Sequence, residues 1–173
     1  MSQEGSRATT RQNPATPGHA TPGHATPGHA APETRTGDWR PYFEGEWLLS
    51  KTIEHFNGAG TATFEGRAVF TRNETALGYA ENGVMRVADM VLPSETRQNW
   101  RFPSYHVVEI DFADGRFFCT FDLSEAPAHT THDCPPDVYR GTLRPEGDDC
   151  WRLIWRAKGP RKDYMSVAEY RRP

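Results

Sequence analysis

Residues 64–70 (FEGRAVF) and residues 107–112 (VVEIDF) alternate their side chains with a period of two. In the first stretch Phe64 and Phe70 share one face, and in the second Ile110 lies opposite the acidic residues that flank it. A strand places successive side chains on opposite faces, whereas a helix repeats every 3.6 residues. Both stretches therefore predict strands with one apolar face.

The same period extends along most of the chain after residue 43. Seven further runs have strand character: 47–53, 76–87, 96–102, 116–123, 138–144, 151–157 and 163–171. Many of the runs are separated by residue pairs typical of tight turns: Asn57-Gly58, Asp114-Gly115, Glu146-Gly147 and Gly159-Pro160. The helical signal is limited to one turn at 38–43, with Asp38 as its cap. The sequence therefore predicts an all-β domain.

The topology follows from the connections between these runs. The chain has no long amphipathic segment that could connect parallel strands, so the strands are expected to form an antiparallel up-and-down meander. Nine such strands would remove their exposed edges by closing into a β-barrel, and a two-sheet sandwich is the alternative. Residues 122–137 lack a strand pattern and are predicted to be a long loop over the barrel.

The first 38 residues differ from the rest in composition. They contain no Leu, Ile, Val, Phe, Tyr or Trp, so residues 1–38 are predicted to be a disordered tail and residues 39–173 the β-barrel domain. The pentamer ATPGH is repeated three times over residues 15–29. The histidines of the repeats, His19, His24 and His29, could chelate a metal weakly, but a low-complexity linker is the favoured interpretation.

Composition also limits the classes of function. The net charge of -3 gives no basic surplus for nucleic acid, and no apolar run resembles a signal peptide or a membrane span. Three cysteines without a repeating spacing are expected to be reduced thiols. We therefore expect a cytoplasmic protein without membrane or nucleic-acid partners. Motifs of acyl hydrolases, nucleotide-dependent kinases and common metalloproteases are absent from the sequence.

Short motifs point to known families. Residues 43–47 (FEGEW) resemble the Gly-x-Trp start of the calycin superfamily of lipocalin-type barrels. This resemblance implies a calycin-like barrel in which a terminal arginine, Arg171 or Arg172, packs across Trp47. The succession GRAVF, YAENG, DGRFF, HDCPPDVYRG and KGPRKDY resembles DUF6314, a family of bacterial and fungal proteins of unknown function. That resemblance implies an architecture and no activity.

The densest polar stretch, HTTHDCPPDVY at 129–139, suggests proton-transfer chemistry. His132 titrates near neutrality, and Asp137 could fix the tautomer of its ring. Tyr139 or Lys162 could then steady an oxyanion. These four residues are the catalytic candidates for a cofactor-independent isomerase, lyase or cyclase. A solvated loop with Tyr139 in the core is the simpler alternative.

A second cluster, KGPRKDY at 158–164, suggests an anion site. Arg161 and Lys162 flank a tight turn and could hold a carboxylate or phosphate, although an exposed charged hairpin is equally compatible. The ligand-binding candidates are Arg161, Tyr139, Trp155, Tyr164 and Arg156. The leading hypothesis is a small-molecule-binding barrel whose ligand is polar or anionic and partly aromatic, with no cofactor.

Two other interpretations remain open at this stage. A metal site would use His129, His132, Cys134 and Asp137 together, but the spacing H-x-x-H-x-C-x-x-D matches no zinc pattern. A haem site would use His129 or His132 as its axial ligand. The prediction therefore assigns no metal ligands. A protein-interaction barrel that uses the tail as a tether would instead expose an apolar patch.

Overall fold

The computed structural model describes residues 37–173. The predicted disordered tail and its three ATPGH repeats, with His19, His24 and His29, lie outside the described residues, except for Gly37 and Asp38. Within residues 37–173 no helix is long and apolar enough to cross a membrane.

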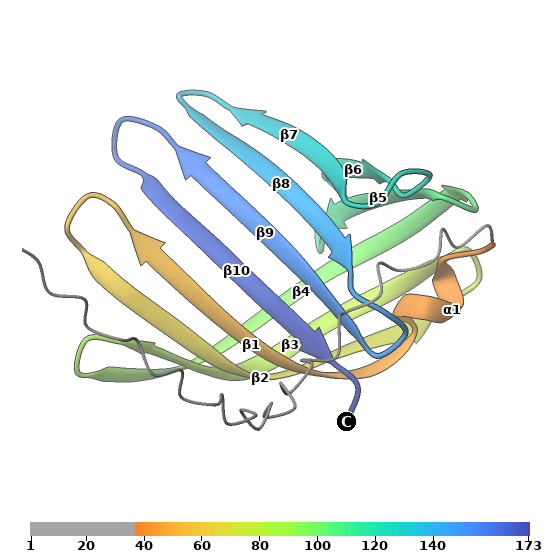
Figure 1. The fold of residues 1–173 in the computed structure, drawn as a ribbon, viewed down its shortest axis with the longest axis horizontal. Coiled ribbons are helices and arrows are strands. Elements are labelled where there is room, and N and C mark those ends of the chain that lie inside the picture. The colour runs from red at the N-terminus through yellow and green to blue at the C-terminus, as the bar shows by residue number, and fades with distance from the viewer. Residues whose placement is uncertain (1–36) are drawn as a thin grey trace, which may run out of the picture.

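The described chain contains one short helix followed by ten strands (Figure 1). These are α1 (Arg40–Phe43), β1 (Gly45–His55), β2 (Gly60–Arg72), β3 (Ala76–Val87), β4 (Met90–Ser104), β5 (Val107–Phe112), β6 (Phe117–Asp122), β7 (Ala128–Cys134), β8 (Asp137–Pro145), β9 (Cys150–Lys158) and β10 (Asp163–Arg171). The helical turn lies within the predicted residues, but its N-cap is Trp39 and not Asp38. The Asp38 carboxylate accepts a hydrogen bond from the backbone N–H of Arg40 at 2.9 Å.

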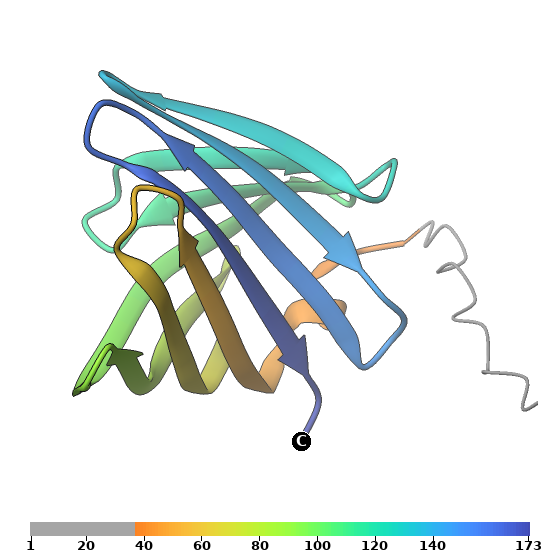
Figure 2. The same ribbon diagram turned by 60° about the vertical axis from the view of Figure 1, so that its left-hand side comes forward.

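All ten strands form a single antiparallel sheet in the order β6-β5-β4-β3-β2-β1-β10-β9-β8-β7. The sheet curls on itself so that its two edge strands, β6 and β7, approach each other (Figures 1 and 2). Within residues 37–173 no hydrogen-bonded ladder joins β6 to β7, but the rings of Phe118 and His132 touch across this seam, with centroids 4.7 Å apart. The predicted all-β, antiparallel up-and-down barrel is confirmed, in a nearly closed form.

The prediction of a long loop at 122–137 is wrong, because this segment contains β7, a strand in addition to the nine predicted. β7 pairs with β8 from Ala128↔Leu143 to Cys134↔Asp137, with Pro135 and Pro136 in the turn. Its inward-facing side chains are Ala128, Thr130 and His132, of which only the first is apolar, so the alternation that marks the other strands is missing. The β-branched threonines suit a pleated strand even without that alternation.

One end of the barrel is filled by aromatic side chains, and we call it the closed end. The α1 segment covers it and contributes Phe43, whose ring lies 5.3 Å from Trp100 and 5.2 Å from Trp151. Trp47 is fully buried beside them, and its indole N–H donates to the carbonyl of Phe43 at 2.7 Å. Burial of several large aromatic side chains supplies a large part of a small domain's stability.

The predicted terminal arginine is Arg172. Its guanidinium lies 3.8 Å from the centroid of the Trp47 ring and donates to the carbonyls of Tyr42 and Glu44 at 2.7 and 2.9 Å. The structure explains why the Gly-x-Trp motif has glycine at position 45. The backbone φ of Gly45 is 104°, which favours glycine, and an added Cβ would lie 3.0 Å from Arg172 Nη1. Arg171 instead pairs with a carboxylate on the outer face.

Candidate functional site

The interior changes character along the barrel axis. On β1, Trp47 and Leu49 are buried, whereas Lys51, Ile53 and His55 on the same face are only half-buried. The alternate residues of the strand are exposed and face outward. The interior face is therefore filled at the closed end and accessible toward the β1–β2 turn.

β3 and β10 show the same gradient, whereas Ala62 on β2 and Ala157 on β9 are buried near the mouth. On β10, Tyr170 and Ala168 are buried and Ser166 and Tyr164 are half-buried. The turns β1–β2, β3–β4, β7–β8 and β9–β10 lie together on the left of Figure 1, opposite α1. We call this end, with the turns at 56–59, 88–89, 135–136 and 159–162, the mouth.

Lys162 links the β9–β10 turn to β8 at the mouth. Its ammonium binds Asp137 Oδ2 at 2.8 Å and donates to the hydroxyl of Tyr139 at 2.6 Å. These two bonds raise the pKa of Lys162 above its ordinary value. Asp137 lies directly against Gly159, where an added Cβ would collide with the carboxylate. Burial raises the pKa of the neighbouring Tyr164.

Aromatic rings line the same end. The ring of Trp155 lies 5.1 Å from Phe118, which in turn contacts His132. Gly141 provides the space for this indole, because an added Cβ would lie 2.7 Å from the ring. The His132 ring also lies 6.0 Å from that of Tyr139. The mouth therefore combines flat apolar surfaces with hydrogen-bonding groups.

The structure brings together most of the residues that the sequence suggested. Residues that face the interior near the mouth, or reach it from the β9–β10 turn, are His132, Asp137, Tyr139, Trp155, Lys162 and Tyr164. Within residues 37–173, however, no hydrogen bond joins His132 to Asp137, and the acidic side chain pairs with Lys162 instead.

Two predicted ligand-binding arginines lie apart from that group. Arg156 is on the outer face, where its guanidinium lies 4.8 Å from the ring of Phe56 and binds Asp163. The tryptophan face of β9 is the inner one, as expected from burial. Arg161 is exposed in the β9–β10 turn and has no acidic partner in the described part of the chain.

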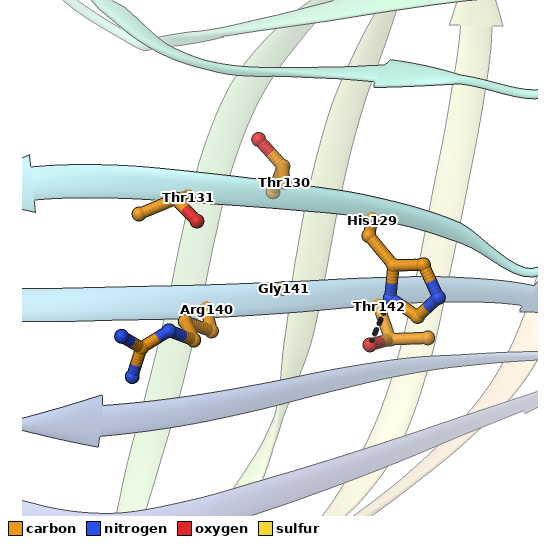
Figure 3. Close-up of a pocket in the computed structure, with 6 residues that line it drawn as sticks. All are labelled: His129, Thr130, Thr131, Arg140, Gly141 and Thr142. Carbon is orange, nitrogen blue, oxygen red and sulfur yellow. Dashed lines mark hydrogen bonds between the residues drawn. The ribbon is translucent and has the colours of Figure 1, made fainter.

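The two histidines proposed as metal or haem ligands point to opposite faces of β7. His129 faces outward, where its Nδ1 lies 3.1 Å from the hydroxyl of Thr142 (Figure 3). These residues and Arg140 line a shallow outer pocket of about 400 Å³. Because His132 faces the interior, one ion cannot bind both rings, and residues 37–173 contain no group of three side chains that could hold a metal.

Sequence reasoning did not identify a buried polar cluster inside the barrel. The Glu81 carboxylate is hydrogen-bonded by Lys51 Nζ at 2.5 Å and by the Tyr79 hydroxyl at 2.6 Å, and it lies 3.5 Å from Thr96 Oγ1. The Tyr79 and Tyr170 hydroxyls are 3.1 Å apart. Burial raises the pKa of both tyrosines.

A signal for this cluster is present in the sequence. Lys51 has the same parity as Trp47 and Leu49 on its strand, and Glu81 has the parity of Leu77. A charged residue on an apolar face indicates either a buried ion pair or a functional group. Only the three-dimensional register shows that these two charges face each other.

The fold and this interior define a nearly closed antiparallel barrel. Apolar side chains fill one end, and the other end has accessible inward-facing side chains, several of them polar. Residues 43–172 match a family of unknown function, DUF6314, and the chain belongs to that family. No curated protein matches the sequence.

Similar solved structures include the S-type phycobiliprotein lyase CPES from Guillardia theta, with a TM-score of 0.59 and 8% identity over 81% of this chain and 94% of that chain. A fluorescence-activating β-barrel designed de novo has a TM-score of 0.45 and 17% identity over 79% of this chain and 98% of its own. At such identities the likeness concerns the fold alone.

Proposed function

We propose that this protein binds a small molecule inside the mouth end of the barrel. The observation that carries the proposal is the burial gradient on one continuous inner face, from fully buried Trp47 to half-buried His55. Inward-facing side chains that stay accessible leave room for a ligand, whereas a purely structural barrel fills its interior to the rim. The related fold of a phycobiliprotein lyase supports the architecture only.

The residues at the mouth suggest a partly aromatic ligand with polar substituents. Trp155 offers a flat surface, and the hydroxyl groups of Tyr139 and Tyr164 offer hydrogen bonds. Asp137 neutralises Lys162, so we assign the binding of an anionic group at the rim to the guanidinium of Arg161. We also propose a cytoplasmic location, because the three cysteines are free thiols.

Blocking the mouth tests this proposal. Ser166 faces the interior and is half-buried, whereas Ser50 is exposed on the outer face of β1. We expect 8-anilinonaphthalene-1-sulfonate, which is aromatic and anionic, to bind the full-length protein with enhanced fluorescence. Ser166→Phe should weaken its binding at least tenfold, and Ser50→Phe should leave it unchanged. Equal binding by both variants would place the dye elsewhere and refute the proposal.

The predicted acid–base enzyme is a second candidate, favoured by the inward position of His132 beside Tyr139. Its pairing with Asp137 stays a prediction, and in the structure Asp137 binds Lys162. Once a ligand is identified, His132→Gln distinguishes the two functions. A binding protein should retain its affinity, whereas an enzyme should lose turnover by about a hundredfold or more.

A further inference from the structure

The ion pair between Lys51 and Glu81 lies at the boundary between the filled and the accessible parts of the barrel. Leu49, one inward position nearer the closed end, is buried, and Ile53, one position nearer the mouth, is half-buried. The Glu81 side chain is 4% exposed and that of Lys51 is 18% exposed. The Lys51 side chain is therefore the more accessible member of the pair and lies at the floor of the mouth.

The residues that lie beside Lys51 in its row of strand pairs are apolar. The row of directly paired residues that passes through it from β4 to β7 contains one charged side chain. In order, the row is Leu92, Met85, Phe64, Lys51, Ala168, Leu153, Leu143 and Ala128. The ammonium also lies 5.1 Å from the centroid of the Phe64 ring. Lys51 is thus the one charged side chain in this row and offers a polar contact for a molecule that enters from the mouth.

The hydrogen bonds of the pair leave donors unused. A lysine ammonium has three N–H groups. Within the described residues Lys51 gives one to Glu81 Oε2, and that oxygen also accepts from Tyr79. A buried ion pair generally stabilises a fold no more than apolar side chains of similar size would. Stability alone therefore does not explain a lysine at this position.

We propose that Lys51 is the polar anchor for the ligand and that it binds a neutral carbonyl or hydroxyl oxygen attached to an apolar body. A carboxylate would be disfavoured, because it would lie beside the Glu81 carboxylate, whose Oε2 is 2.5 Å from Lys51 Nζ. Met85 and Ile53 face the interior on either side of this position and suit a hydrocarbon body. This inference rests on the proposed function and specifies its ligand class.

A matched pair of neutral dyes tests the anchor. One is 6-propionyl-2-(dimethylamino)naphthalene, which has a ketone, and the other is 6-propyl-2-(dimethylamino)naphthalene, which lacks the oxygen. A hydrogen bond from a charged donor should make the full-length protein bind the ketone about tenfold more tightly than the alkyl dye. Lys51→Met combined with Glu81→Gln removes both charges, so it avoids an unpaired buried carboxylate and should reduce the preference to nearly one.

Lys158→Met is the control, because Lys158 is exposed on the outer face and bonded to Asp163. It should keep the wild-type preference. A second readout uses the wild-type protein alone: the bound ketone should emit at longer wavelength than in an apolar solvent without donors. Equal affinity for the two dyes, emission typical of a donor-free solvent, or a preference retained in the double variant would each overturn the anchor. If neither dye nor the anilinonaphthalene sulfonate binds, the proposed function itself fails.

Discussion

The two ends of the barrel are built from the same strands and the same inner face, yet their side chains differ. Trp151 and Trp155 are four residues apart on β9 and both point inward. Trp151 is fully buried and stacks on Tyr170, with ring centroids 3.6 Å apart, whereas Trp155 is half-buried beside Phe118. The closed end is therefore the more tightly packed part of the fold, and the mouth is the part to which we assign the proposed binding.

This division has a physical cause. An aromatic side chain contributes to stability in proportion to the apolar surface that it buries. At the closed end α1 covers the barrel, so Phe43 and its neighbours lose nearly all contact with water. No comparable element covers the mouth within residues 37–173, so polar groups such as Lys162 can lie there and remain partly exposed to water.

The largest effect is expected from truncating the two tryptophans of β9 separately. Trp151→Ala should lower the free energy of unfolding by about 3–5 kcal/mol, because it leaves a cavity among packed aromatic rings. Trp155→Ala should lower it by about 1–2 kcal/mol, because less of its surface is buried. Urea denaturation of both variants measures the difference. Equal losses would show that the mouth is packed as tightly as the closed end.

A smaller effect is expected for the arginine that covers the closed end. Arg172→Ala removes the cation–π contact with Trp47 and the hydrogen bonds to two backbone carbonyls. The free energy of unfolding should fall by about 1–3 kcal/mol. Arg171→Ala is the matched control, since that side chain pairs with Glu169 on the surface, where ion pairs contribute little. If thermal unfolding shifts equally in both variants, the contact with Trp47 is not stabilising.

The sequence could predict the parts of this structure that depend on local pattern. Alternation at residues 64–70 and 107–112 predicts strands, and the Gly-x-Trp motif together with the terminal arginines predicts the contact of Arg172 with Trp47. β7 was missed because only one of its inward residues is apolar, so it lacks the periodic signal. A strand that contributes mainly threonine and histidine to the interior looks like a polar loop.

The site depends on register, which one sequence does not specify. Tyr139 and Trp155 could be placed on a strand face from alternation alone, but the outward position of Arg156 follows only once the inner face is known. The pairing of Lys51 with Glu81 brings together residues from β1 and β3, strands that are not neighbours in the sheet. The spacing of each strand shows that these two side chains share its inner face, but not that they meet.

The smallest effect is expected at Cys119, and it tests whether water is excluded from the barrel wall between the two ends. Cys119 on β6 is 1% exposed, and burial raises the pKa of its thiol from 9.0 to about 12. Between pH 9 and 12 the folded protein therefore keeps a proton that the unfolded chain has lost, so the free energy of unfolding must fall as pH rises. Cys119 should contribute up to about 1.4 kcal/mol per pH unit to this fall.

Cys119→Ala removes that contribution, so its stability should decline less steeply than that of the wild type between about pH 9 and 10. The two proteins should show parallel pH dependence between about pH 6 and 8, where the thiol is protonated in both states, and this range serves as the internal control. Urea denaturation at each pH measures both slopes. Tyr79 and Tyr170 also have raised pKa values and will steepen the decline equally in both proteins. Parallel curves up to about pH 10 would therefore mean that water reaches Cys119, and the accessible interior would extend further than the mouth.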